Sequence, residues 1–296
     1  MNWYQIAGIN ISISWEKEEE KQHIYAYHDC IILPRVMEAF GIRQINKAQV
    51  LGTMNVRVHG IEEIEINAKS RQVYNQRWQE TEDKKILTMY DLVRGDQMGY
   101  SIVMAKDYSQ VDYLPHCEEY NHYDLQWLIY PFECRMLYLG GIVLHGAAIE
   151  YKAQGIIFSG VSGAGKSTQA HLWQYYREAL ILNGDAPAIH DMDGIPRVYG
   201  TPWCGSSGEA INRSIPLKAV ILVKKGEVNK IRKLDEREAV LALFSNTFHM
   251  NFDLAVIDFC MAYIQKLVKH IEVYELTCRV DEGAVEVVQS AIFKEK

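Results

Sequence analysis

The fold of this chain is decided by the stretch Gly160-Val161-Ser162-Gly163-Ala164-Gly165-Lys166-Ser167. It follows the pattern Gly, four residues, Gly-Lys-Ser, which is typical of a phosphate-binding loop. Glycines are needed because only they let successive backbone N–H groups turn inward around a phosphate without a Cβ in the way. The flanking sequence fits, since residues 155–159 form an apolar run that predicts a buried strand and residues 168–179 predict a helix.

Each residue type in this motif has a predicted role in binding a nucleotide. Lys166 is expected to reach the β- and γ-phosphates and Ser167 to hold Mg²⁺, while the N-terminus of the next helix favours the same anion. We predict phosphate contacts from Gly160, Ser162, Gly163, Ala164, Gly165, Lys166, Ser167 and Thr168. A glycine-rich turn that binds nothing is disfavoured, because both the motif and its strand-to-helix context are present.

The composition predicts a folded cytoplasmic protein. The chain has 296 residues, of which 48% are hydrophobic, so it can bury a large core in one or two domains. Its formal net charge of −7 offers no general attraction for nucleic acid or an anionic membrane, and neither partner is expected. The 6 cysteines never form Cys-x-x-Cys, so we predict reduced thiols and no zinc site. The N-terminus lacks the basic region of a signal peptide.

The first part of the chain is predicted to be rich in β-structure. Apolar and polar residues alternate in several short runs, and the clearest are residues 9–15, 56–58, 64–66, 86–89 and 100–104. We predict a mainly antiparallel N-terminal domain over residues 1–122, followed by a second domain over residues 123–296. Residues 124–139 have apolar side chains at helical spacing and predict a buried connecting helix, kinked at Pro131.

Two short apolar segments flank the motif in sequence and carry the other candidate catalytic residues. Residues 141–149 predict one strand, which contains His145; a lone histidine of this kind is more often structural than catalytic. Residues 180–182 predict a core strand that ends in Asn183-Gly184-Asp185. A strand can thereby deliver the Asp185 carboxylate to a bound nucleotide, to organise Mg²⁺ or to accept a proton. A turn without chemistry is the alternative.

The remaining segments complete an α/β pattern. Asp193-Gly194 predicts a hairpin turn, and residues 201–208 form a small-residue loop suited to an active site or an acceptor. Arg213 precedes the predicted strand 219–223 and could meet phosphate oxygens, although a surface arginine is equally consistent with the sequence. Asp235 and Glu238 resemble a capping box that opens a helix through residue 248. A helix over 254–271, a strand over 273–278 and a helix over 282–293 follow.

With these residues in place, the second half of the chain resembles the HPr kinase/phosphorylase family. The resemblance covers about residues 140–280 and is carried by Leu144-His145-Gly146, by the loop of residues 159–168 and by Leu182-Asn183-Gly184-Asp185. It implies a core with a phosphate-binding loop and a mixed sheet. It also implies transfer of the γ-phosphoryl group of ATP to a hydroxyl, with Mg²⁺, and gives His145 and Asp185 catalytic roles beside Lys166.

The sequence departs from the family at one position, because Gly184 replaces the first residue of the family's Asp-Asp pair. One carboxylate is therefore missing, which puts Mg²⁺ coordination and any reverse reaction in question. The expected acceptor is a serine of a protein or peptide, and the first alternative is the hydroxyl of a small molecule. The second alternative is that the chain is a nucleotide-binding regulatory module without catalysis. The family also allows a homo-oligomer. The predicted fold class is α/β, with a β-rich N-terminal domain before the kinase-like core.

Overall fold

A computed structural model describes residues 2–16, 36–41, 50–61, 64, 70–91, 97–117, 125–248 and 253–293. The chain forms two compact units, one of Met1–Leu139 with Met250–Leu254 and one of Gly140–His249 with Ala255–Lys296. Each unit contains a mixed sheet, so the α/β class and the β-rich N-terminal region are confirmed. Compact units need not fold independently, and the domain boundary after residue 122 stays a prediction.

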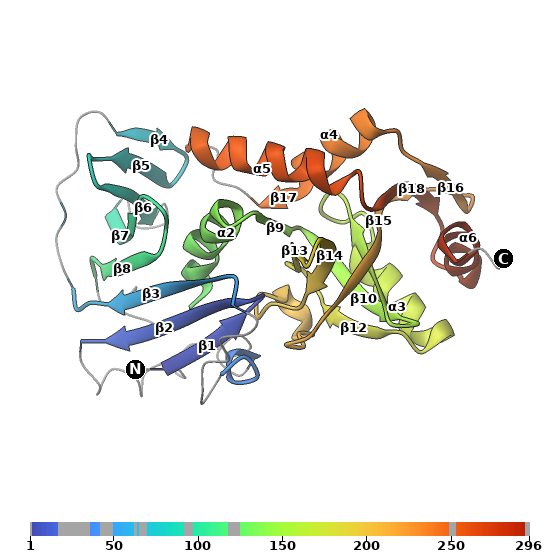
Figure 1. Ribbon diagram of the computed structural model, residues 1–296, viewed down its shortest axis with the longest axis horizontal. Coiled ribbons are helices and arrows are strands. Elements are labelled where there is room, and N and C mark those ends of the chain that lie inside the picture. The colour runs from blue at the N-terminus through green and yellow to red at the C-terminus, as the bar shows by residue number, and fades with distance from the viewer. Residues whose placement is uncertain are drawn as a thin grey trace. The chain divides into compact units, whose positions relative to one another are not determined.

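The N-terminal unit is built on a sheet whose order is β1-β2-β3-β8-β7-β6-β5-β4 (Figure 1). Strands β2 and β3 are parallel, as are β3 and β8, and the other neighbours are antiparallel. The described strands are β1 (Asn2–Ile6), β2 (Ile9–Trp15), β3 (Gly52–Val58), β4 (Arg71–Val73), β5 (Gln76–Glu80), β6 (Lys84–Asp91), β7 (Gln97–Ala105) and β8 (Gln110–Pro115).

The predicted strands over 9–15, 56–58, 86–89 and 100–104 all lie within these elements, which confirms them. The alternation was informative because one face of the sheet is apolar, as in β2, where Ile9, Ile11 and Ile13 are fully buried. Of the predicted strand 64–66, Ile64 is described but belongs to no strand, and residues 65 and 66 lie outside the described residues.

A short helical segment follows the sheet, with the 3₁₀ turn η4 (Gln126–Leu128) leading into α2 (Ile129–Tyr138). The Trp127 ring stacks on Tyr113 of β8, with ring centroids 4.3 Å apart. The helix predicted over residues 124–139 is shorter in the structure, and nothing in it requires a kink at Pro131. Because α2 begins at Ile129, Pro131 occupies the first helical turn, where no intrahelical N–H donor is needed.

The C-terminal unit contains a 10-stranded sheet with β12-β10-β11-β15-β14-β13-β9-β17 as its main path. Off this path, β18 pairs with β15 and β16 pairs with β18. Strands β11, β15 and β18 are parallel. The strands are β9 (Gly141–Leu144), β10 (Gly146–Tyr151), β11 (Gln154–Ser159), β12 (Leu180–Asn183), β13 (Ala188–Met192), β14 (Ile195–Tyr199), β15 (Ser214–Lys225), β16 (Lys230–Lys233), β17 (Thr247–Phe248) and β18 (Glu272–Cys278).

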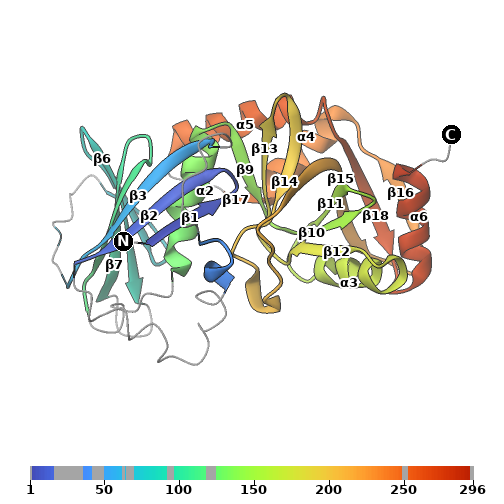
Figure 2. The same cartoon turned by 60° about the horizontal axis from the view of Figure 1, so that its bottom comes forward.

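Helices cover this sheet (Figure 2). Helices α3 (Lys166–Arg177) and α6 (Glu282–Ile292) bury Trp173 and Val288 in one core with Phe158 of β11. On the β13–β14 hairpin, α5 (Leu254–Leu267) is held by Tyr263, whose hydroxyl donates to Asp191 at 3.1 Å. The remaining helical elements of this unit are α4 (Glu236–Asn246) and the 3₁₀ turn η5 (Gly205–Ser207).

The predicted start of α4 and the predicted hairpin turn are confirmed, whereas two predicted helix ends are wrong, because α4 ends at Asn246, before the strand β17, and α5 ends at Leu267. Helix α4 has the predicted capping box, with Glu238 N donating to the Asp235 carboxylate at 2.8 Å and Asp235 N donating back to Glu238 at 3.1 Å. Asp193 and Gly194 have φ of 53° and 77°, which are the positive values that a tight hairpin turn needs. Helix α3 begins two residues before the predicted residue 168, at Lys166.

The single strand predicted over residues 141–149 is wrong, because the chain divides at His145. Strand β9 pairs with β13 and β17, whereas β10 pairs with β11 and β12. His145 lies between these two sets of partners, and its backbone N–H donates to Asn246 O at 2.8 Å. The break depends on strands distant in sequence, so the local apolar run carries no sign of it.

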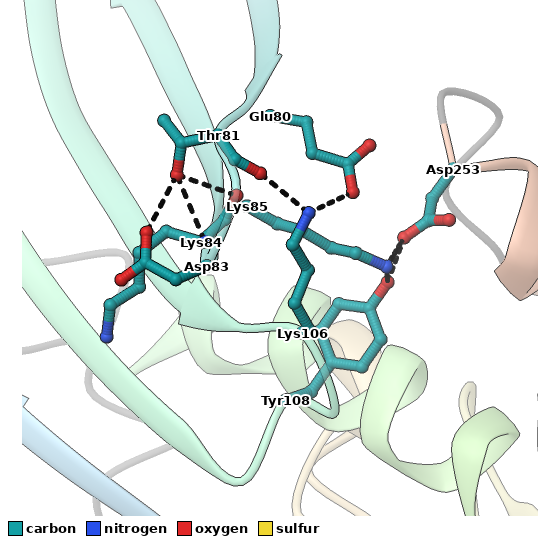
Figure 3. Close-up of polar contacts among 8 residues, drawn as sticks. All are labelled: Glu80, Thr81, Asp83, Lys84, Lys85, Lys106, Tyr108 and Asp253. Carbon is teal, nitrogen blue, oxygen red and sulfur yellow. Dashed lines mark hydrogen bonds and ion pairs between the residues drawn. The ribbon is translucent and has the colours of Figure 1, made fainter.

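The N-terminal unit also holds a buried polar cluster (Figure 3). Lys85 of β6 donates to the Tyr108 hydroxyl at 2.7 Å and forms an ion pair with Asp253, to which Tyr108 also donates. At most 7% of any of these three residues is exposed. Burial also raises the pKa of Tyr108. In the described part of the chain, no helix has both the length and the apolar character needed to cross a membrane.

Candidate active site

Three sequence-predicted residues meet at one edge of the C-terminal sheet. Strands β11 and β12 both run antiparallel to β10, so both end at the edge where β10 begins. The glycine loop, residues 160–167, follows β11, Asp185 follows β12, and His145 immediately precedes β10. The carboxyl ends of strands in open α/β sheets are where ligands characteristically bind.

Short contacts hold these three segments together. Gly146 N donates to Asp185 O at 2.8 Å, and the Ser159 hydroxyl donates to His145 O at 2.7 Å. The His145 Nδ1 and Asp185 Oδ1 atoms lie 3.2 Å apart. Within the described residues, however, this Nδ1 has no partner with hydrogen-bond alignment. About a third of each side chain is exposed, so both are open to a ligand.

The glycine loop has the backbone that the motif requires. Gly160, Gly163 and Gly165 have φ of 137°, 75° and 106°, values that favour glycine over other residues. A Cβ on Gly160 would lie 3.0 Å from Val223 O, so the loop also approaches β15 closely. Around Gly163, by contrast, an added Cβ would meet no atom within 4 Å. The middle of the loop is therefore an open cradle.

Lys166 begins α3 and bends back over the loop. Its ammonium group donates to Gly160 O at 3.1 Å and to Val161 O at 3.2 Å. Burial lowers the pKa of Lys166, and the negative charge of Asp185 partly opposes this effect. The exposed fraction of Lys166 is only 8%, so a cation is held largely out of water at the base of the cradle.

These residues fit a nucleoside triphosphate with Mg²⁺. Backbone N–H groups in an open glycine cradle, a helix N-terminus and a partly desolvated lysine all favour an anion. Ser167 and Thr168 are exposed in the first turn of α3, where a hydroxyl can hold a metal ion bound to phosphate. Ser162 is exposed on the loop as well. In the described residues, no group of three or more His, Cys, Asp or Glu side chains forms a separate metal site.

His145 is oriented by contacts that its sequence neighbours do not reveal. The Phe248 ring of β17 meets the imidazole edge to face, with centroids 5.5 Å apart and an interplanar angle of 85°. At the end of α4, Asn246 O accepts the His145 backbone N–H. The histidine is therefore fixed from α4 and β17, about a hundred residues later in the chain.

Asp185 is positioned by Asn183, a residue whose role the sequence did not indicate. The buried Asn183 Oδ1 accepts from the backbone N–H groups of Asp185 at 2.9 Å and Ala186 at 2.7 Å. Its Nδ2 donates to Thr201 O at 2.7 Å and to Trp203 O at 3.3 Å. One amide therefore shapes the Asp185 turn and ties it to the following loop. The only sequence signal was an Asn-Gly-Asp turn.

The loop of residues 201–209 packs directly on this turn. Gly184 N donates to Glu209 O at 3.0 Å. A Cβ on Gly184 would lie 2.1 Å from Ser207 Oγ and 3.0 Å from Cys204 O. The position that lacks the expected carboxylate is therefore filled by the loop, and no side chain fits there unless the loop moves.

Arg213 is placed apart from this group. Its guanidinium pairs with Glu150 at 2.7 Å, and Glu150 lies near the far end of β10 from His145. The structure thus brings together His145, Lys166 and Asp185 with the glycine loop, and it pairs Arg213 elsewhere. The catalytic role of Arg213 stays a prediction.

A cavity of about 420 Å³ opens beside the start of the loop. Gly160 and Val161 line one side of it and Leu241 and Asn246 of α4 another. Arg232 crosses its wall, with both Glu238 oxygens at 2.9 Å and Glu275 at 3.1 Å. Lys224, which also lines the cavity, pairs with Glu275 at 2.5 Å, so two cations balance two carboxylates and the wall has no net preference for an anion.

Comparisons with known proteins identify a family and several similar solved structures. A family model described as "SynChlorMet cassette protein ScmC" matches residues 116–294, which is more than half of the chain. No curated protein matches. A structure of the Hpr(Ser) kinase/phosphatase from Coxiella burnetii is similar at 9% identity and a TM-score of 0.30, covering 51% of this chain and 97% of that one. This TM-score is too low to establish a shared fold.

Proposed function

We propose that this chain, which belongs to the ScmC family of SynChlorMet cassette proteins, is an ATP-dependent kinase that phosphorylates a hydroxyl group. The observation that carries the proposal is the meeting of the glycine loop, Lys166, Asp185 and His145 at one sheet edge. A phosphate-binding loop alone fits many reactions of nucleotides. A carboxylate and an imidazole beside it add the groups that hydroxyl phosphorylation needs.

Some residues of the site would bind the nucleotide, and others would transfer the proton. Lys166 and the loop N–H groups hold the phosphates and stabilise the charge that spreads over the transferred group. Ser167 and Asp185 would hold Mg²⁺, which when bound neutralises phosphate charge and aligns the oxygens. Asp185 accepts the proton of the acceptor hydroxyl. His145, whose Nδ1 lies 3.2 Å from this carboxylate, can receive the proton in turn.

We take serine of a protein or peptide as the acceptor and place the enzyme in the cytosol, where ATP is available. A small-molecule hydroxyl is the alternative acceptor of the same chemistry. Neither acceptor requires nucleic acid or a membrane, in keeping with the net charge of −7.

A nucleotide-binding regulatory module is the second candidate, and one observation favours it. Gly184 leaves the turn with Asp185 as its one carboxylate, and Ser207 fills the space in which a second would stand. Phosphoryl transfer depends mainly on positioning and charge neutralisation, which one carboxylate with Lys166 can provide. For this reason the kinase ranks first.

The deciding experiment follows label from γ-labelled ATP with Mg²⁺ in cytosolic extract, separated into protein, peptide and metabolite fractions. Lys166→Ala is the blank, and Lys218→Ala on β15 is a control because this lysine lies outside the proposed site. Label in protein or peptide that disappears only with Lys166→Ala supports the serine kinase. Label in metabolites supports the small-molecule acceptor.

The role of Asp185 has its own test. Asp185→Asn keeps the shape but removes the proton acceptor, so we expect transfer to fall by about 10²-fold or more. Nucleotide affinity should stay within a few fold, because phosphate contacts come from the loop. Full transfer by Asp185→Asn would exclude it as the base. Nucleotide binding without Lys166-dependent label in any fraction would leave the regulatory module.

A further inference from the structure

A serine of the chain itself lies against the turn that carries the proposed base. The close approach at Gly184 places Ser207 Oγ where a side chain at that position would begin. Two residues earlier, a Cβ on Gly205 would lie 3.2 Å from Asp185 Cβ and 3.4 Å from Asp185 Oδ2. Two small residues of the turn η5 thus pack on Gly184 and Asp185: Ser207 on Gly184 and Gly205 on Asp185.

This serine is held near the turn and is still accessible. At the end of the loop, Glu209 bonds to Gly184 through its backbone, and its carboxylate lies 3.2 Å from His171 Nε2 of α3. Ala210 then forms a β-bridge with Asn183. Residues 205–208 are nevertheless exposed, so the Ser207 hydroxyl is not sealed in the core.

We propose that Ser207 is an intramolecular phosphoryl acceptor of this site. The inference rests on the proposed kinase function and names a substrate for it, a serine between small residues. Gly205, Ser206 and Gly208 surround it, and none has a side chain large enough to keep the γ-phosphate of a nucleotide away. An exposed small-residue segment with a central serine is also the kind of peptide that a separate acceptor would offer.

The transfer balances with the groups present. Ser207 Oγ forms a bond to the γ-phosphorus of ATP as the bond from that phosphorus to its bridging oxygen breaks. The hydroxyl proton passes to the Asp185 carboxylate, and ADP leaves. The products are ADP, phosphoserine and one proton. The Ser207 hydroxyl donates to Cys204 O at 2.8 Å in the resting loop, so it must turn from this carbonyl toward Asp185.

The modification would release the loop that carries it. Ser207 Oγ now donates to Cys204 O and accepts from Glu209 N at 3.2 Å. An esterified oxygen has no hydrogen to donate, and a phosphate adds a charge of about −1.5 to −2 beside Asp185 and Glu209. Repulsion from both carboxylates then favours a displaced loop. The first turnover on Ser207 thereby gives a separate acceptor wider access to the partly exposed base.

The test uses the purified full chain with γ-labelled ATP and Mg²⁺ and no other acceptor. We expect one phosphoryl group per chain, mapped to Ser207 by mass spectrometry, at a rate per chain that does not change on dilution. When wild type is mixed with Lys166→Ala, whose Ser207 is intact, the variant chain should stay unlabelled. Hydrogen exchange of residues 201–209 should become faster after phosphorylation, which is a readout independent of turnover.

Matched variants separate the possible outcomes. Ser207→Ala should reduce the label to the Lys166→Ala level, whereas Ser290→Ala, which removes an exposed serine of α6, should not change it. Label on Ser206, on another residue or on the Lys166→Ala chain in the mixture would overturn the inference. An unlabelled chain in an extract where other proteins become labelled would overturn it and leave the kinase standing. No Lys166-dependent label in either assay would overturn both.

Discussion

The smallest informative change at the scale of single residues is one methyl group on Gly184. Gly184 is buried, and a Cβ added to it would lie too close to Ser207 Oγ and Cys204 O for both groups to keep their positions. Nothing in the backbone conformation forbids a side chain here, because Gly184 is not among the glycines with positive φ. The requirement for glycine is therefore imposed by the loop and not by the turn.

We predict that Gly184→Ala lowers the free energy of unfolding by about 1–3 kcal/mol, as for other overpacked sites. Adding Ser207→Gly removes the atom that clashes at 2.1 Å, so the double variant should recover part of this loss. Urea unfolding of the two single variants and the double variant measures the coupling. Strictly additive losses would mean that the loop does not rest on Gly184.

Glu133 supplies a prediction about pH. This buried residue of α2 has a pKa raised by desolvation from 4.5 to about 8. Between these two values the folded chain keeps a proton that the unfolded chain has lost. Stability should therefore fall as pH rises through this window, by up to about 1.4 kcal/mol per pH unit. Glu133→Gln should flatten the fall in urea midpoints, whereas Glu286→Gln on α6 should follow wild type.

At the scale of elements, the candidate site depends on one buried amide. Asn183 Nδ2 donates to the carbonyl groups of the 201–209 loop, and Asn183 Oδ1 accepts from the Asp185 turn. We predict that Asn183→Asp lowers the free energy of unfolding by about 1–3 kcal/mol, because buried carbonyls lose their donor. It should also reduce kcat more than it changes nucleotide affinity.

The matched control for this change is Asn229→Asp. Asn229 makes comparable hydrogen bonds in a different turn. Its Nδ2 donates to Asp281 at 2.7 Å, and its Oδ1 accepts from Arg279 N at 2.9 Å. Unfolding and steady-state kinetics of both variants separate a general effect from one on the Asp185 turn. Equal kinetic losses in the two variants would contradict a special role for Asn183.

Features that depend on residues close together in sequence were predictable, whereas features that depend on contacts between distant parts of the chain were not. The glycine loop, the capping box at Asp235 and the hairpin turn at Asp193 depend on residues within a few positions of one another. The break at His145 depends on strands 40 to 100 residues away. The packing of Ser207 on Gly184 likewise crosses 23 positions, so the sequence indicated a small-residue loop but not what it covers.

At the scale of the whole molecule, a buried ion pair decides where one segment lies. The backbone leaves the C-terminal unit after His249, contributes Met250–Leu254 to the N-terminal unit and resumes the C-terminal unit at Ala255. Asp253 in this segment pairs with Lys85, and Tyr108 donates to the same carboxylate (Figure 3). An unpaired charge at this depth is strongly unfavourable, so the pair favours one path of the chain over others.

We predict that Asp253→Asn lowers the free energy of unfolding by about 3–5 kcal/mol, because it leaves the Lys85 cation buried without its counter-charge. Combining it with Lys85→Met removes that cation and should restore part of the loss. Glu272→Gln is the control, since its ion pair with Lys233 at 2.5 Å is about half exposed and worth at most about 1 kcal/mol. Urea unfolding measures all four chains, and equal losses for Asp253→Asn and Glu272→Gln would contradict the prediction.

Because Met250–Leu254 belongs to the N-terminal unit, that unit cannot be separated from the rest by one cut in the coding sequence. A polypeptide ending at residue 139 would carry the whole described N-terminal sheet but not Asp253, and Lys85 would face a gap where its partner belongs. Supplying residues 250–254 from a second polypeptide could complete that unit only at the entropic disadvantage of joining two molecules. Recombination that moves the β-rich part alone into another protein should therefore yield poorly folded products.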